Sequence, residues 1–140
     1  MNSETETNKN IVRALYDAID RADREAAFAL LHPEYEMSMQ GTGRQLDAEG
    51  YWSLIETIRT ALNGLIHLSD VMIAEGDRVS TRGMVIATHI GPLYGVAATG
   101  RTVQTPYLNM VRIKDGKVIE MVALMDTQLL ELQIRSGEAS

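Results

Sequence analysis

Asp126 is the residue of this 140-residue chain whose type and position best fit acid–base chemistry. The two-residue period of a strand places Val122, Leu124 and Asp126 on one face of an apolar segment. A carboxyl group at the end of such a face is desolvated, which raises its pKa towards the range useful for proton transfer. Asp126 also directly precedes a helical pattern at 127–130 and fits as its N-cap. The sequence therefore leaves two roles open, catalytic base and helix cap.

His89 is the second candidate, at the end of a predicted strand. Its imidazole could donate a hydrogen bond to a substrate carbonyl and stabilise a developing enolate. The alternative is a structural histidine whose ring is satisfied at a strand end. The other histidines, His32 and His67, form no His-x-His or Glu-x-x-His spacing, so we expect no metal site.

Asn109 and Tyr107 share one face of an apolar strand and are predicted to face a ligand cavity. A buried amide without partners costs about 2–7 kcal/mol, so Asn109 either meets a ligand or water in a cavity or points to solvent. We favour the cavity for both residues. Pro106 would shift this register if it marks a strand edge or a bulge.

Four more residues are candidates for substrate binding. Tyr35, Tyr51 and Trp52 come from an extended piece and a helix that could line or cover the mouth of a pocket. Tyr51 and Trp52 also fit the buried stripe of that helix. Met125, one of eight methionines, fits an adaptable apolar pocket wall, and its alternative role is filling the core.

Helical periodicity dominates the first half of the chain. Apolar residues at three- and four-residue spacing predict an amphipathic helix over 11–22. Asp23 is expected to cap a short second helix that Pro33 ends. Asp47 is expected to cap a third helix, which stops at Asn63-Gly64 because these residue types tolerate a left-handed conformation.

The second half has the pattern of strands. Four segments rich in Val, Ile, Thr and Met are predicted to be strands, at 66–75, 78–90, 101–113 and 117–125. Tight-turn signals at 76–77 and 114–116 predict antiparallel neighbours. The loop at 91–100 is expected to form a lid, and an amphipathic helix over 129–134 closes the chain. The predicted fold is α+β: N-terminal helices on one face of a curved antiparallel sheet, forming a cone with an internal pocket for a small apolar molecule.

Composition excludes several classes of function. With 45% hydrophobic residues the chain can build one core, and a net charge of −6 argues against nucleic-acid or anionic-membrane partners. The absence of cysteine excludes thiol chemistry. The longest apolar run, 26–31, is far shorter than the ~20 residues of a membrane span, and no secretory signal is visible, so we expect a cytoplasmic protein. We expect a flexible tail at 1–9, one domain at 10–135 and a flexible end at 136–140.

Three stretches carry a resemblance to a known family. ATHIGPLYGVAATGR at 87–101, RIKDGKVIE at 112–120 and MDT at 125–127 resemble, in order and spacing, motifs of the SnoaL-like polyketide cyclases of the nuclear transport factor two-like superfamily. The resemblance covers about residues 9 to 135. It implies the cone fold and a general acid/base role for Asp126, and the family often carries a histidine at the position of His89. Met125 departs from the pattern, because the family has Trp there.

The leading functional hypothesis is a cofactor-independent enzyme acting on a hydrophobic small molecule, by aldol-type cyclisation of a polyketide. Asp126 would remove a proton from a methylene between two carbonyls, and His89 and Asn109 would support carbonyl oxygens while the pocket holds the folded geometry. The alternatives are epoxide opening or isomerisation in the same pocket, and a non-catalytic binding protein in which Asp126 is a helix cap. By analogy with the family we expect a homodimer formed through the exposed face of the sheet.

Overall fold

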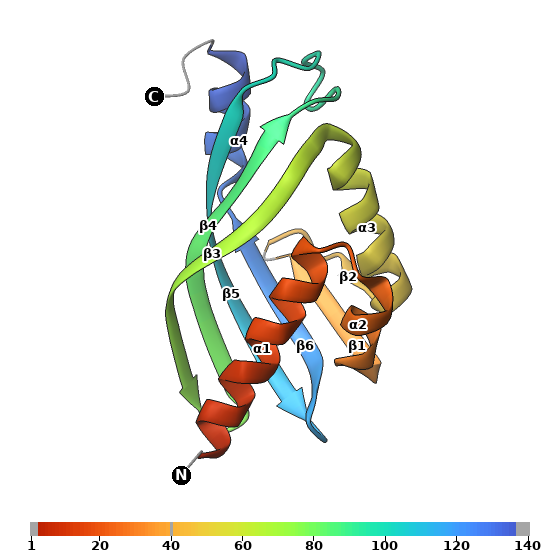
Figure 1. Ribbon diagram of the computed structural model, residues 1–140, viewed down its shortest axis with the longest axis vertical. Coiled ribbons are helices and arrows are strands. Elements are labelled where there is room, and N and C mark those ends of the chain that lie inside the picture. Colours follow the sequence, from red (N-terminus) through yellow and green to blue (C-terminus); the bar gives the residue numbers. More distant parts are fainter. Residues whose placement is uncertain (1–2, 40, 137–140) are drawn as a thin grey trace.

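The computed structural model describes residues 3–39 and 41–136 of the chain. Helices cover one face of a sheet, and the last helix lies at one end of it, beside β5 (Figure 1). The elements in chain order are α1 (Glu4–Asp20), α2 (Arg24–Ala29), β1 (Leu31–Met39), β2 (Gln45–Leu46), α3 (Ala48–Ala61), β3 (Leu62–Glu75), β4 (Arg78–His89), β5 (Thr102–Lys114), β6 (Lys117–Met125) and α4 (Thr127–Arg135).

Each of these four helices begins after a side chain that accepts a hydrogen bond from the backbone N–H three residues ahead. The caps are Ser3, Asp23, Asp47 and Asp126. The predicted caps at Asp23 and Asp47 are confirmed. Such a side chain satisfies one of the N–H groups that the first turn of a helix leaves without a partner.

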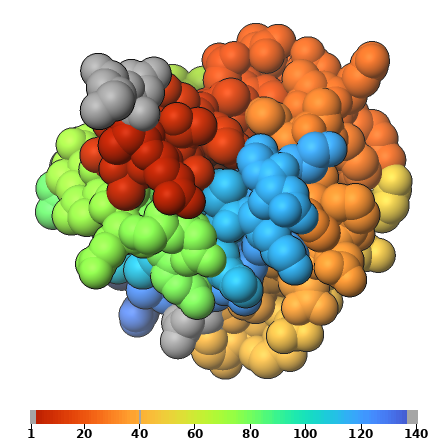
Figure 2. All heavy atoms as spheres, turned by 90° about the horizontal axis from the view of Figure 1, so that it is seen from below, coloured from red at the N-terminus to blue at the C-terminus, as the bar shows by residue number. Residues whose placement is uncertain are grey.

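The flexible tail predicted at 1–9 is wrong from Glu4 onwards, because these residues form the first turns of α1. α1 begins at Glu4, because Ser3 caps it and Glu4 and Glu6 place negative charge at its positive end. Asn8 is buried, and its side-chain nitrogen donates to the Gly76 carbonyl at 3.3 Å. Seen from below, the start of α1 lies against the ends of the β3–β4 and β5–β6 hairpins (Figure 2). Residues 1–2 and 137–140 lie outside the described residues.

The sheet has the strand order β2-β1-β6-β5-β4-β3. The antiparallel pairing predicted for the last four strands is confirmed, but β1 pairs in parallel with β6, so the sheet is mixed. The start of β1 also differs from the prediction, because Pro33 was expected to end α2 and instead lies inside β1. The register shifts between Leu31 and Glu36, and this irregularity accommodates a residue that has no N–H for the ladder.

Two glycines shape the long strand β3 and its neighbour. The chain passes from α3 into β3 at Leu62, earlier than predicted, and Gly64, with φ +66°, lies at the register shift that follows. Gly83 of β4 faces Ser69, where β3 shifts register again. A Cβ on Gly83 would lie 2.2 Å from the Leu68 carbonyl oxygen, so only glycine allows this approach of the two backbones.

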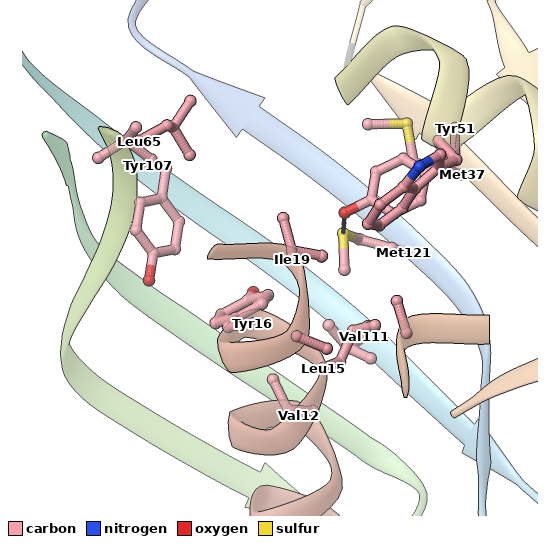
Figure 3. Packing of buried hydrophobic residues seen from close by; sticks show 14 of the residues in the cluster. Val12, Leu15, Tyr16, Ile19, Met37, Tyr51, Leu65, Tyr107, Val111 and Met121 are labelled. Carbon is pink, nitrogen blue, oxygen red and sulfur yellow. Dashed lines mark hydrogen bonds between the residues drawn. The ribbon is translucent and has the colours of Figure 1, made fainter. Parts of the chain in front are cut away.

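The core lies between α1 and the inner face of the sheet. Val12, Leu15 and Ile19 of α1 are buried and point towards Val111 and Met121 (Figure 3). No helix within the described residues is long and apolar enough to cross a membrane.

The outer face of the sheet carries an apolar patch that no helix covers. Leu108 of β5 and Leu124 of β6 pair across the strands, and each is 48% exposed. Alternate residues of β5, Tyr107 and Asn109, are buried on the inner face. The sheet therefore has an apolar inner face, which the helices cover, and an apolar patch on its outer face beside charged residues such as Arg82.

Candidate functional site

The inner face of the sheet and the helices enclose an apolar pocket with two lobes. The first lobe has a volume of about 110 Å³ and is lined by α3, the end of α1 and the strands β1, β3, β4, β5 and β6. The second, about 270 Å³, lies under α3 and the 91–100 loop. Both lobes are lined by Met39, Ile58, Leu65, Val85 and Met125. Pockets for small molecules usually measure 300–1,000 Å³, so a ligand needs both lobes. The five shared side chains would have to move aside to join the two lobes.

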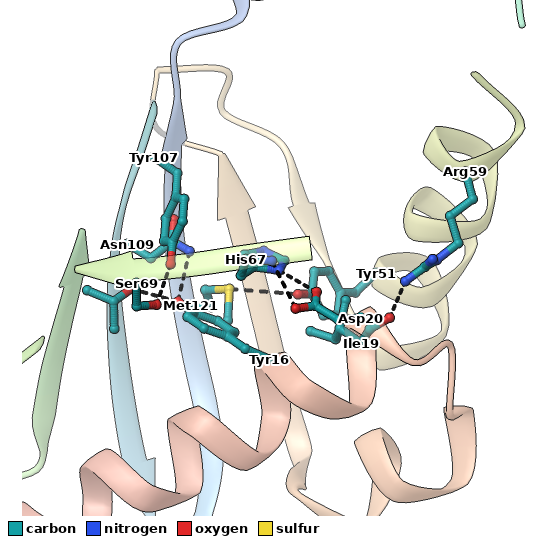
Figure 4. Close-up of polar contacts among 11 residues, drawn as sticks. Tyr16, Ile19, Asp20, Tyr51, Arg59, His67, Ser69, Tyr107, Asn109 and Met121 are labelled. Carbon is teal, nitrogen blue, oxygen red and sulfur yellow. Dashed lines mark hydrogen bonds and ion pairs between the residues drawn. The ribbon is translucent and has the colours of Figure 1, made fainter. Parts of the chain in front are cut away.

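Asn109 and Tyr107 lie in the wall of the first lobe, where the sequence analysis placed them. The Asn109 side-chain nitrogen donates to the Tyr16 hydroxyl oxygen at 3.0 Å, and the Tyr107 hydroxyl lies 2.5 Å from the Ser69 hydroxyl (Figure 4). The amide nitrogen of Asn109 has a second hydrogen that a carbonyl in the lobe could accept. Their role towards a ligand stays a prediction.

Tyr16 is a neutral hydrogen-bonding residue beneath this wall. Its hydroxyl accepts from Asn109 and lies 2.7 Å from the Thr81 hydroxyl, to which it can donate. Burial raises the pKa of Tyr16 to about 12, because the charged phenolate would be desolvated. Tyr16 therefore stays protonated at ordinary pH and holds Asn109 in a fixed orientation.

An Asp–His pair that the sequence analysis did not find lies beside the same lobe. The Asp20 carboxylate, at the end of α1, lies 2.7 Å from Nδ1 of His67 in β3 and accepts the His67 backbone N–H at 2.9 Å (Figure 4). The His67 ring stacks on Tyr16, with 4.8 Å between ring centroids. The sequence offered one weak signal, an imidazole between Ile66 and Leu68 in a strand, and no spacing that linked it to Asp20.

His89 lies outside the pocket wall. It is fully buried, and its Nδ1 accepts the Thr99 backbone N–H at 3.3 Å and lies 2.9 Å from the Thr99 hydroxyl. Its backbone bonds to Gly100 and Arg101. Nε2 is enclosed without a partner among the described residues. The Nδ1 and backbone contacts fix the end of the 91–100 loop, but the ring is not fully satisfied as the structural alternative expected. The role of His89 towards a substrate stays a prediction.

Asp126 is exposed and caps α4, so its predicted burial is wrong. One carboxylate oxygen accepts the Leu129 N–H at 2.9 Å. The two-residue period held, but the face that Asp126 shares with Leu124 is the outer one, and Met121 and Met125 point inwards. Asp126 lies in an outer groove of about 520 Å³. Its catalytic role stays a prediction.

The remaining candidates divide between pocket and core. Tyr51 and Met125 line the pocket, and Met125 contributes to both lobes. Tyr35 is buried behind Tyr51, with 5.5 Å between their ring centroids, and Trp52 packs edge-on against Phe28 at 6.2 Å. Tyr35 and Trp52 therefore belong to the core and line neither lobe.

The loop predicted to form a lid borders the second lobe. Pro92, Leu93 and Tyr94 line it. Gly91 packs closely against the end of α3. A Cβ on this residue would lie 2.3 Å from the Thr60 carbonyl oxygen, so only glycine fits there. The first residue of the loop is thus fixed, and its apolar residues face the pocket.

The fold and the pocket define an α+β cone domain that encloses an apolar site for a small molecule. The chain belongs to the SnoaL-like polyketide cyclase family, whose sequence model matches residues 9–134. The resemblance found in the sequence and the predicted fold class are thereby confirmed.

Similar proteins carry different descriptions. Aklanonic acid methyl ester cyclase DnrD of Streptomyces peucetius is 24% identical over 115 residues, which cover 80% of this chain and 79% of DnrD. IdmH of Streptomyces antibioticus, described as a candidate polyketide cyclase, superposes with a TM-score of 0.84 at 25% identity, covering 90% and 96% of the two chains. AclR of Streptomyces galilaeus, described as a candidate hydroxylase, gives 0.85 at 24% identity over 95% and 83%. The fold is thus shared by proteins to which different reactions are ascribed.

Proposed function

We propose that this chain catalyses a cofactor-independent, aldol-type ring closure of a hydrophobic polyketide in the two-lobed pocket. The observation that supports the proposal is the apolar pocket itself, closed by α3 and carrying a few polar groups at one end, in a chain of the SnoaL-like family. A base removes a proton from a methylene between two carbonyls. The resulting enolate carbon attacks a second carbonyl carbon, and the new alkoxide takes the proton back.

The pocket contributes mainly by positioning. Holding the enolate and the carbonyl carbon in contact can supply about 7–11 kcal/mol of the barrier when the geometry is good. The Asn109 amide hydrogen and the Tyr107 hydroxyl are the groups that would hold carbonyl oxygens, because both lie in the wall of the first lobe. The methionines Met39 and Met125 suit a flat, polycyclic product because their side chains adapt in shape.

A direct test uses the compound for which DnrD is named. Incubation with aklanonic acid methyl ester should convert it into a product of unchanged mass and altered chromatographic retention, because an intramolecular aldol addition loses no atoms. Ala123→Phe should lower the rate at least tenfold by filling the first lobe, which Ala123 lines. The matched control Ala14→Phe, on the exposed side of α1, should leave the rate unchanged.

The second candidate function is a non-catalytic binding protein. The lining of the second lobe favours it, because it is mostly apolar and contains no ionisable side chain except Tyr94. In that case the parent protein would bind the compound and form no product. Ala123→Phe would then weaken this binding. Recovery of intact ligand from the complex would decide against the cyclase.

The apolar patch on the outer face of the sheet supports a homodimer. Leu68, Leu108, Met110 and Leu124 are each 41–50% exposed there. An uncovered apolar surface of this kind is typical of an interaction site, and a second copy offers a surface of the same character. We therefore include the homodimer in the proposal.

A further inference from the structure

The His67 ring is held by contacts on three sides. Asp20 binds both its Nδ1 and its backbone N–H, at 2.7 and 2.9 Å. Tyr16 stacks on one ring face, and Tyr107 meets the ring edge-on with 5.4 Å between centroids. The side chains of His67 and Asp20 are only 14% and 16% exposed. This pair is therefore preorganised, and most of its surface is shielded from bulk water.

The Asp20 contact fixes which ring nitrogen is free. An ionised carboxylate can only accept, so the neutral ring carries its hydrogen on Nδ1 and its lone pair on Nε2. Nε2 has no hydrogen-bond partner among the described residues. The surrounding side chains do not enclose this atom, so a molecule can reach it. A free, oriented lone pair on imidazole is what a general base requires.

His67 also lies at a boundary between water and the apolar pocket. It lines the first lobe, and it lines an open polar groove of about 430 Å³ between α1 and β3. Arg13, Asp17 and Asp70 line that groove too, and Asp17 and Asp70 pair with Arg21 and Arg82. Asp20 is therefore the carboxylate that would balance a proton gained by the ring.

We propose that His67 is the general base of this pocket, that Asp20 is its positioning residue, and that the group they act on is an acidic C–H beside a carbonyl. The proposal rests on the proposed function for its substrate class. Nε2 takes the proton from carbon, and the C–H electron pair becomes the enolate. After the new C–C bond forms, the imidazolium returns that proton to the alkoxide, so nothing is oxidised or reduced.

The position of His67 suits this role better than that of Asp126. His67 belongs to the wall of the first lobe, whereas Asp126 is exposed in the outer groove and bonds to the Leu129 N–H. A neutral imidazole also enters an apolar wall at lower cost than a carboxylate.

A probe unrelated to polyketides tests the base directly. In 5-nitrobenzisoxazole a base removes the C3 proton, the N–O bond breaks and its electron pair leaves on oxygen, which gives the coloured 2-cyano-4-nitrophenolate. The parent protein should accelerate this reaction, and His67→Gln should lower kcat about 100-fold. His32→Gln is the matched control, because His32 lies 3.5 Å from Asp115 but lines neither lobe, and its rate should match the parent's.

Asp20→Asn should lower kcat about tenfold with little change in KM, because the amide no longer fixes the ring. Long-range ¹H–¹⁵N spectra should show protonated Nδ1 and unprotonated Nε2 for His67 in the parent, and a mixture in Asp20→Asn. A parent-like rate in His67→Gln, no acceleration by the parent, or a hydrogen on Nε2 in the parent would each overturn the proposal. If the probe reacts as expected and aklanonic acid methyl ester does not, the proposed function fails and the base remains.

Discussion

Asn109 donates a hydrogen bond to the Tyr16 hydroxyl at 3.0 Å, and this contact joins β5 to α1 across 93 positions of the chain. The Tyr16 hydroxyl also lies 2.7 Å from the Thr81 hydroxyl. All three residues are buried. The wall of the first lobe therefore depends on a polar contact between the first helix and two strands of the sheet.

Removing the Tyr16 hydroxyl should destabilise the protein measurably. Tyr16→Phe leaves the Asn109 amide and the Thr81 hydroxyl without their common partner, and we expect the free energy of unfolding to fall by about 1–3 kcal/mol. Urea denaturation measures the change. Tyr94→Phe, at a partly exposed tyrosine of the loop, serves as the control and should change stability by less than about 0.5 kcal/mol. Equal stability of parent and Tyr16→Phe would show that the contact contributes nothing.

Stability should also depend on alkaline pH through Tyr16. Burial raises the pKa of Tyr16 from 10.0 to about 12, so the folded state keeps its proton where the unfolded chain has lost it. This contribution is fully present below pH 10 and is lost as the pH rises from 10 to 12, on the order of 3 kcal/mol. Urea unfolding at stepped pH should show a steeper decline for the parent than for Tyr16→Phe. Parallel curves would contradict the raised pKa.

Two substitutions at Asp126 separate its role as a cap from its predicted role as a base. Asp126→Ala should lower stability by about 0.5–2 kcal/mol, because the Leu129 N–H loses its acceptor. Asp126→Asn should keep nearly full stability, since asparagine caps as well. Thermal melts test the cap, and turnover of aklanonic acid methyl ester by Asp126→Asn tests the base. Loss of turnover at unchanged stability would support the catalytic role predicted from the sequence.

The proposed homodimer predicts a mass in solution of about twice the 15.5 kDa of one chain. Met110→Glu should produce monomers, because Met110 pairs with Ser80 of β4 and Val122 of β6 on the outer face, and neither could balance a charge buried there. Light scattering measures both masses. Ile73→Glu, at an apolar residue near the end of β3 that is 63% exposed, is the comparison and should remain a dimer. A parent mass near 15.5 kDa would reject the homodimer.

The fold followed from local patterns to a large extent. Hydrophobic period and turn residues predicted the antiparallel strands, and Asp23 and Asp47 marked the starts of two helices. The parallel pairing of β1 with β6 was missed because nothing local in either segment reports a partner so distant in sequence. Pro33 misled the prediction for the same reason: a bulge that tolerates proline depends on the neighbouring strand.

The site was harder to predict than the fold. The two-residue period grouped Asp126 with Leu124 correctly but could not say which face of the sheet the helices cover, and that choice decides between a buried and an exposed carboxylate. Asp20 and His67 were missed because their contact comes from packing a helix end against a strand. Asn109 and Tyr107 were placed correctly, since a polar side chain amid apolar neighbours in a strand is itself a local signal.

The pairing of β1 with β6 bears on how the chain folds during synthesis. Leu31 lies beside Val118 and Met39 beside Ala123, so β1 pairs with β6. An early strand of the sheet therefore depends on a strand that is synthesised much later. β1 cannot pair with β6 until β6 has left the ribosome. Until then the buried face of α1 lacks part of the sheet surface on which it packs. Such non-local topologies fold slowly and expose apolar surface for longer. We therefore expect a nascent chain that stops before β6 to depend on chaperones and to aggregate without them.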